Sequence, residues 1–212
     1  IGHGYILERQ SILIHGSGVD LDNLKFKTRS GLKPISFLFS SRLVKAKGIR
    51  EFIEAGIVMK KLYPEISLNI AGRYDSSDPD SISEKLFQEM QNLNIFNYLG
   101  NVDYDDTQQL YLNSDIFILP SYGEGLPKAA VEAATSGMPL ILSNVSGCAE
   151  CLHEGINGFF VDVHDALSVK NAMEKFITEP GIINNMSINS RQLIESKFSI
   201  KRISDQYKAL LH

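Results

Sequence analysis

Two loops of this sequence carry charged side chains in patterns that suit the binding of a phosphate-bearing, hydroxyl-rich ligand. In the first loop, Arg42 and Lys47 stand between an apolar run and a helical pattern that begins near Gly48. A guanidinium offers a planar fork of donors and an ammonium a mobile point charge, and both bind phosphate oxygens. The amides of the following helix N-terminus add donors and partial positive charge. Taken alone, such cations more often form a solvated surface, so the second loop is the stronger indication.

The second loop is glycine-rich and leads into an apolar helical pattern, with the sequence PSYGEGLPKAAVEAATSG over residues 120–137. Gly123 and Gly125 let the backbone turn sharply and approach a ligand closely. Pro127 suits the first turn of a helix, where its missing N–H is not needed. The helix N-terminus then points at a cleft in which its free amides donate to a diphosphate.

Two carboxylates, Glu124 in this loop and Glu132 on the helix behind it, suit a different part of the ligand. Carboxylates repel phosphates but accept hydrogen bonds from the hydroxyls of a sugar or a ribose. The other interpretation of Glu132 is an ordinary exposed helix residue. Its neighbours argue against that, because the alanines and valine on either side predict a buried helix, in which a carboxylate needs polar partners.

Short apolar runs alternate with helical patterns along the chain, and both loops follow such a run. The runs are continuously apolar, as in strands covered on both faces, and occupy residues 35–39, 66–70, 96–99, 116–119, 140–142 and 159–161. Helical stripes occupy residues 48–62, 83–93 and 168–177. This alternation predicts an α/β fold, a Rossmann-like, doubly wound parallel sheet with right-handed crossovers. Ligands of such sheets bind beyond the carboxyl ends of the strands, where both loops lie.

The two ends of the chain are interpreted separately from this sheet. Residues 1–33, with a short strand at 12–14 and a glycine-rich turn at 15–18, are expected to be the end of a preceding domain and a linker. Residues 34–195 are expected to form one domain, and residues 196–212 a C-terminal helix. Because the chain starts at Ile1 without Met, we expect it to be part of a longer protein.

Composition argues against several classes of function. Hydrophobic residues make up 43% and charged residues 22%, which is a globular composition, and the net charge of −4 gives no general attraction to nucleic acid. The sequence has no apolar run as long as a membrane span and no signal-peptide pattern at its start. Cys148 and Cys151 form a CxxC pair, either a redox or zinc half-site or two free thiols. Because no second set of ligands is nearby in the sequence, we favour free thiols.

Two further segments each allow two interpretations. Residues 143–150 follow the apolar run at 140–142 and either line the same cleft or form a turn. Asp103-Tyr104-Asp105 matches the Asp-x-Asp pattern of metal-dependent transferases, but it also suits a helix N-terminus with Asp103 as the cap. We favour the helix N-terminus and expect neither a metal nor another cofactor.

The two carboxylates are separated by seven residues within GEGLPKAAVEAATSGMP, which resembles the signature of the retaining GT-B glycosyltransferases of family 4. That family includes sucrose-phosphate synthases and many bacterial capsule and O-antigen transferases. The resemblance covers roughly residues 11–165, in the expected order, through GVDLDNL, SRLVKAKGIREFIEA, ISLNIAG, NYLGNV, SDIFILPS and GINGFFVDVHD. It implies the C-terminal, nucleotide-sugar-binding half of a two-domain GT-B fold.

The resemblance also implies a role for each candidate residue. Arg42 and Lys47 would hold the donor diphosphate and stabilise the leaving group without a metal, and Glu124 would bind the transferred sugar. Glu132 would accept hydrogen bonds from the ribose hydroxyls. Gly125, Leu126 and Pro127 would frame the sugar through backbone groups, and residues around Asn101 and Val102 would contact the base. Gly72 and Gly123 would also belong to the donor-binding residues. Ser41 departs from the family, which often has glycine before the arginine, and we expect this small side chain to be tolerated.

For the whole protein, the resemblance implies transfer of a sugar with retention from a nucleotide sugar, expected to be a UDP-sugar. The acceptor is expected to be a saccharide or a lipid-linked molecule in the synthesis of bacterial capsule, O-antigen or lipopolysaccharide. The missing N-terminal domain would bind it, so this chain alone is expected to be inactive. The expected location is cytoplasmic, at the inner face of the membrane, with peripheral membrane contact by the full-length enzyme and no nucleic-acid partner.

Two alternatives stay open at this point. One is a nucleotide-sugar epimerase of the same fold, against which the closely spaced glutamates argue. The other is a non-catalytic, donor-domain-like module that binds a partner. The complete set of Arg42, Lys47, Glu124 and Glu132 argues against it.

Overall fold

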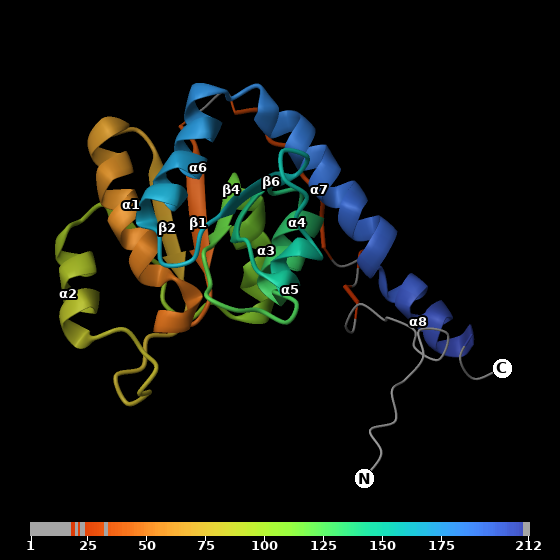
Figure 1. Ribbon diagram of the computed structural model, residues 1–212, viewed down its shortest axis with the longest axis horizontal. Helices are drawn as coiled ribbons and strands as arrows, with labels where there is room; N and C mark the ends of the chain where they lie inside the picture. The colour runs from red at the N-terminus through yellow and green to blue at the C-terminus, as the bar shows by residue number, and fades with distance from the viewer. Residues whose placement is uncertain (1–17, 20, 22–23, 32–33, 210–212) are drawn as a thin grey trace, which may run out of the picture.

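The computed structural model describes residues 18–19, 21, 24–31 and 34–209 of the chain. The predicted strand at 12–14 and most of the predicted turn at 15–18 therefore lie outside the described residues. Within them, six parallel strands form one sheet in the order β3-β2-β1-β4-β5-β6 (Figure 1). The strands are β1 (Ser36–Ser40), β2 (Ser67–Ala71), β3 (Phe96–Tyr98), β4 (Ile116–Leu119), β5 (Leu140–Ser143) and β6 (Gly158–Val161). The predicted parallel, doubly wound sheet is confirmed.

Helices connect and flank these strands throughout the described part of the chain. They are η2 (Lys45–Lys47, a 3-10 helix), α1 (Ile49–Leu62), α2 (Glu84–Asn92), α3 (Tyr104–Asn113), α4 (Lys128–Thr135), α5 (Ser146–Ala149), α6 (Ala166–Thr178), α7 (Ile182–Phe198) and α8 (Ile200–Ala209). Side-chain caps begin two of them: Ser83 accepts from Leu86 N before α2, and Asp165 accepts from Leu167 N and Ser168 N before α6. The predicted strands and helical stripes match observed elements to within two residues at either end.

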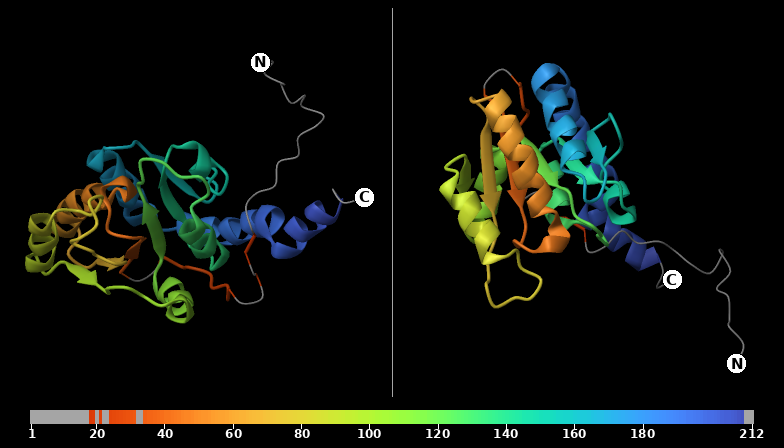
Figure 2. Two further views of the ribbon diagram at one scale, coloured as in Figure 1. Left: turned by 90° about the horizontal axis from the view of Figure 1, so that it is seen from below. Right: turned by 60° about the vertical axis from the view of Figure 1, so that its left-hand side comes forward.

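The sheet is covered by helices on both faces. α1 and α6 pack against each other over one face, whereas α4 and α7 pack together over the other (Figures 1 and 2). In the central strand β1, Phe37, Leu38 and Phe39 are all fully buried, although successive side chains point to opposite faces. This double burial is the reason that the strands are continuously apolar in sequence rather than alternating.

The strand order reverses between β1 and β4, which is where doubly wound sheets bind ligands. The loops that follow these two strands are in direct contact. Tyr122 N donates to the Ala46 carbonyl oxygen at 2.8 Å. Gly48 lies so close to the same loop that a Cβ atom there would stand 2.0 Å from the Pro120 carbonyl oxygen. Both loops selected from the sequence therefore meet at the point where the strand order reverses.

The CxxC pair lies at the carboxyl end of β5. Cys148 in α5 and Cys151 just after it are free thiols with no exposed surface, so the favoured interpretation is confirmed. Burial raises the pKa of Cys148 to about 12, and the nearby Glu124 carboxylate acts in the same direction. Burial likewise raises the pKa of Cys151. Both thiols are therefore protonated and shielded at neutral pH, which makes them poor nucleophiles.

Replacing Gly48 by alanine is expected to destabilise the fold more than the same change at Gly100. Both glycines have a positive φ, of 70° and 69°, so each substitution carries the cost of a left-handed alanine, about 1–2 kcal/mol. At Gly48 the added Cβ also overlaps the Pro120 carbonyl oxygen, whereas at Gly100 nothing lies within 4 Å. Denaturant unfolding should show Gly48→Ala to be less stable by at least about 1 kcal/mol more than Gly100→Ala. Equal losses would contradict the contact between the two loops.

Both thiols are expected to resist alkylation while the protein is folded, because their raised pKa values and burial leave little accessible thiolate at pH 8. Iodoacetamide should leave Cys148 and Cys151 unmodified in native buffer and modify both in concentrated guanidinium chloride. Mass spectrometry of the labelled protein measures this. Rapid modification of either thiol in native buffer would show that α5 opens readily.

Candidate functional site

A cavity of about 250 Å³ opens where the carboxyl ends of β1 and β2 face α3 and α4. Five residues selected from the sequence line it together, namely Arg42, Gly72, Asn101, Val102 and Glu132. The remaining lining residues are Ser40, Ser41, Ala71, Arg73, Thr107, Tyr111 and Ala129. The fold thus gathers side chains from distant parts of the sequence at the predicted edge of the sheet.

Gly72 joins three loops beside this cavity. It follows β2 directly, and its φ of 149° is one that only glycine adopts readily. A Cβ atom at this position would lie 1.7 Å from the Ser41 carbonyl oxygen, and Gly72 N donates to the Gly100 carbonyl oxygen at 2.7 Å. The loops after β1, β2 and β3 therefore meet at a point with no room for a side chain.

Glu132 is held in the cavity wall by α4. The residue is only 8% exposed, which confirms the prediction that this helix is buried and its glutamate with it. The Tyr111 hydroxyl donates to Glu132 Oε2 at 3.3 Å, and Lys128 Nζ lies 3.6 Å from Oε1. Because an ionised carboxylate offers about four lone-pair sites, Glu132 retains acceptor capacity toward the cavity.

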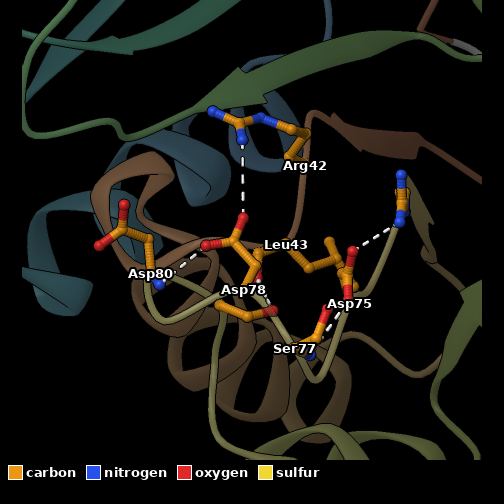
Figure 3. A network of polar contacts seen from close by, with 8 residues as sticks. Arg42, Leu43, Asp75, Ser77, Asp78 and Asp80 are labelled. Carbon is orange, nitrogen blue, oxygen red and sulfur yellow. Dashed lines mark hydrogen bonds and ion pairs between the residues drawn. The ribbon is translucent and has the colours of Figure 1, made fainter.

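Arg42 reaches across to the loop between β2 and α2. Figure 3 shows its guanidinium facing Asp78, with Nη1 3.6 Å from Oδ2. The loop carrying Asp78 is shaped by its own hydrogen bonds, including Asp80 N to Asp78 Oδ1 at 2.9 Å (Figure 3). Ile82 N also donates to the Leu43 carbonyl oxygen at 3.0 Å, which ties the loop to the segment after β1. The Arg42 side chain is 68% exposed, so this ion pair is weak and leaves the guanidinium able to turn to an anion.

Lys47 and Glu124 form a second group, and neither lines the cavity. Lys47 Nζ donates to Glu124 Oε1 at 2.7 Å. The two side chains are 24% and 9% exposed, so the pair is partly shielded from water. The structure therefore joins the first loop to the second through the two charged residues that the sequence assigned to diphosphate and sugar.

The N-terminus of α4 lies between Glu124 and Glu132 in the sequence. The helix begins at Lys128 with Pro127 as its N-cap, one residue earlier than the predicted first turn, and no side chain caps its first amides. Gly123 and Gly125 do not have positive φ, and a Cβ atom at either would contact nothing within 4 Å. The backbone at these two positions is therefore one that other residues could also adopt, and their close approach to a ligand stays a prediction. They leave open space beside the loop, next to Leu126.

Residues 143–150 include the short helix α5, which packs against the second loop, and none of them lines the 250 Å³ cavity. A Cβ atom on Gly147, in α5, would lie 2.0 Å from the Gly125 carbonyl oxygen and 2.3 Å from that of Glu124. The backbone around Glu124 therefore packs directly against α5, and the contact is possible because the residue of α5 at this point is a glycine.

Sequence reasoning missed two tyrosines that organise the site. Tyr111 binds Glu132, as described above, and Tyr122 donates to Glu51 Oε1 at 2.7 Å. Burial, together with that hydrogen bond, raises the pKa of Tyr122 to about 12. Glu51 itself could have been selected from the sequence, because it is a carboxylate on the first turn of α1, on a helix face that is otherwise apolar. The structure shows that this carboxylate is buried.

The prediction that Asp103 stands at a helix N-terminus is confirmed, but its side chain does not cap the helix. It is the N-cap of α3, yet its side chain accepts no hydrogen bond from the first turn. Across the described residues, no group of three or more His, Cys, Asp and Glu side chains is arranged to hold a metal ion. None of the described helices is long and apolar enough to cross a membrane.

Comparison with known proteins places this site in a family context. The family model described as "Glycosyl transferases group 1" matches residues 20–193. An Escherichia coli protein named UDP-Gal:alpha-D-GlcNAc-diphosphoundecaprenol alpha-1,3-galactosyltransferase is 30% identical over 218 residues, which cover 96% of this chain and 54% of that protein. The Staphylococcus aureus capsular polysaccharide biosynthesis glycosyltransferase CapM is 28% identical, over 81% of this chain and 44% of its own length. The chain spans about half the length of these relatives.

Among solved structures, Alr3699/HepE from Anabaena in complex with UDP and glucose superposes with a TM-score of 0.79. The match covers 92% of this chain and 55% of that one at 21% identity, and at this level it supports the fold alone. The family model spans every candidate residue, from Arg42 to Glu132, together with the whole sheet. The chain therefore belongs to the glycosyl transferases of group 1 and carries a Rossmann-like domain of their GT-B fold.

Proposed function

We propose that this chain is the donor-binding domain of a retaining glycosyltransferase whose donor is a UDP-sugar. The observation that carries the proposal is the cavity at the carboxyl ends of β1 and β2. Two cations, Arg42 and Arg73, one buried carboxylate and the backbone of three loops converge there, and these are the groups that a nucleoside diphosphate needs. The similarity to the Escherichia coli relative, which is named for a UDP-Gal donor, adds support for the choice of nucleotide.

The cavity holds the nucleoside in this proposal. The Glu132 carboxylate accepts hydrogen bonds from the ribose hydroxyls, and the Tyr111 hydroxyl fixes its orientation. The base lies against Asn101 and Val102, which line the same cavity. Because Gly72 has no side chain, the backbone after β2 can come close to the nucleoside.

The diphosphate and the sugar occupy the region between the cavity and the second loop. Departure of a nucleoside diphosphate develops negative charge, which Arg42, Lys47 and the uncapped amides of α4 stabilise. These groups supply the positive charge that a metal supplies in other transferases, while the anomeric carbon becomes oxocarbenium-like. Without a donor, Lys47 and Glu124 neutralise each other. A bound donor gives each its own partner, a phosphate for the lysine and a sugar hydroxyl for the glutamate.

The acceptor is proposed to be a saccharide or a lipid-linked sugar in bacterial polysaccharide synthesis. The Escherichia coli relative is named for transfer to a diphosphoundecaprenol-linked sugar, and the Staphylococcus aureus relative for capsular polysaccharide biosynthesis. We place acceptor binding in a second, N-terminal domain of the full-length protein. The reaction is then cytoplasmic, at the inner face of the membrane, where a lipid-linked acceptor calls for peripheral contact.

Calorimetric titration of the chain with UDP, GDP and ADP tests the nucleotide site. UDP is expected to bind most tightly, and Arg42→Ala is expected to weaken it by at least about tenfold, because a charge-assisted hydrogen bond to phosphate is lost. Glu132→Gln should weaken it as well, through the ribose. Arg50→Ala is the matched control, since this exposed arginine pairs with Glu54 away from the cavity. The proposal would be contradicted if Arg42→Ala and Arg50→Ala lowered the affinity for UDP equally, or if the folded chain bound no nucleotide.

A second titration separates the sugar from the nucleotide. Glu124→Gln is expected to weaken binding of UDP-glucose or UDP-galactose, whichever the unaltered chain prefers, by roughly tenfold. It should bind UDP at least as tightly as the unaltered chain does, because the change frees Lys47 for the diphosphate without stranding a buried carboxylate. Lys47→Met should weaken both ligands through the diphosphate. A Glu124→Gln variant that loses UDP and UDP-sugar equally would contradict the assignment of Glu124 to the sugar.

A further inference from the structure

Arg29 is a buried cation that lies outside the candidate site. It belongs to the segment before β1 and is 2% exposed. Its guanidinium donates to the Tyr111 carbonyl oxygen at 2.7 Å and, through Nε, to that of Ser114 at 3.3 Å. It also donates to the carbonyl oxygens of Ser136 and Lys27. One side chain thus satisfies four backbone acceptors in three different segments.

Two of these segments are helix ends. Tyr111 lies in the last turn of α3 and Ser114 is its C-cap, while Ser136 is the C-cap of α4. Helix C-termini carry partial negative charge and unpaired carbonyls, so a cation between them stabilises both. Burial lowers the pKa of Arg29 to about 10, against the opposing effect of Asp115, and the guanidinium stays charged at neutral pH.

The same two helices also line the cavity. Thr107 and Tyr111 come from α3, and Ala129 and Glu132 come from α4. Tyr111 belongs to both sites, because its carbonyl oxygen accepts from Arg29 and its hydroxyl donates to Glu132 Oε2. The spacing between α3 and α4 therefore decides whether that hydroxyl reaches the carboxylate.

We propose that Arg29 is a positioning residue for the donor site: it holds the C-terminal ends of α3 and α4 together so that Tyr111 orients Glu132 toward the ribose. This inference rests on the proposed function. A lysine cannot replace Arg29, since an ammonium lacks the fixed fork that spans acceptors on separate helices. The fold itself has a second support at the same place, because Arg191 Nη1 donates to the carbonyl oxygens of Thr135 at 3.1 Å and Leu24 at 2.9 Å.

The test compares the affinity of UDP with that of 2′,3′-dideoxy-UDP, which lacks both ribose hydroxyls. The unaltered chain should prefer UDP by roughly tenfold or more, and Glu132→Gln should abolish the preference. Arg29→Lys is expected to reduce it to about threefold or less, with dideoxy-UDP bound nearly as before. A purely structural defect would instead weaken both nucleotides alike. Lys27→Met is the matched control, because Lys27 Nζ also donates to a backbone carbonyl oxygen in the last turn of α3, that of Leu112, at 2.7 Å.

A folded Arg29→Lys chain that keeps the full preference for UDP would overturn the proposal. So would an equal loss of preference in Lys27→Met. If Arg29→Lys does not fold, as circular dichroism will report, Tyr111→Phe decides: loss of the preference supports the proposal, and its retention overturns it. An unaltered chain with no preference for UDP would instead contradict the assignment of Glu132 to the ribose, and this inference with it.

Discussion

The candidate site depends on backbone packing that is too close for side chains. At the carboxyl edge of the sheet, Gly48 lies against Pro120, Gly72 against Ser41, and Gly147 against the loop that holds Glu124. Each contact joins loops that follow different strands, so the loops are fixed relative to one another rather than independently. Loops positioned in this way lose little conformational entropy when a ligand binds, because most of it is lost on folding.

This packing brings charges together, and the structure balances them in pairs of unequal strength. Arg42 meets Asp78 in an exposed ion pair that costs little to break. Lys47 and Glu124 form a shorter and better shielded pair, so neither can be left without a partner. A ligand that offers only phosphates would bind Lys47 and leave Glu124 without a partner, and a ligand that offers only hydroxyls would bind Glu124 and leave Lys47 without one. The pair therefore favours a ligand that presents both, as a nucleotide sugar does.

Much of the fold was predictable, because a doubly covered parallel strand leaves a short, continuously apolar run, and these runs alternate with longer helical stripes along the chain. The residues of the cavity were predictable for a related reason: Arg42 and Glu132 stand beside strand ends that the topology must bring together. The pairing of Lys47 with Glu124 was not, since an ion pair between loops depends on side-chain positions. Arg29 was invisible, because its partners are backbone carbonyls, which leave no trace in sequence. The roles given to these residues in binding stay predictions.

The position of Arg29 has a mechanical consequence that follows from helix length. α3 and α4 are short, at 10 and 8 residues, and a helix of that size moves as a rod. The cation holds one end of each rod, and the cavity is built from the turns that precede those ends. With Arg29 in the proposed role, a change in the segment before β1 alters the spacing of α3 and α4, and with it the Tyr111–Glu132 contact. Arg29 N also donates to Ser187 Oγ in α7, which packs against α4 on the same face of the sheet, so a third helix contacts the residue that joins α3 to α4.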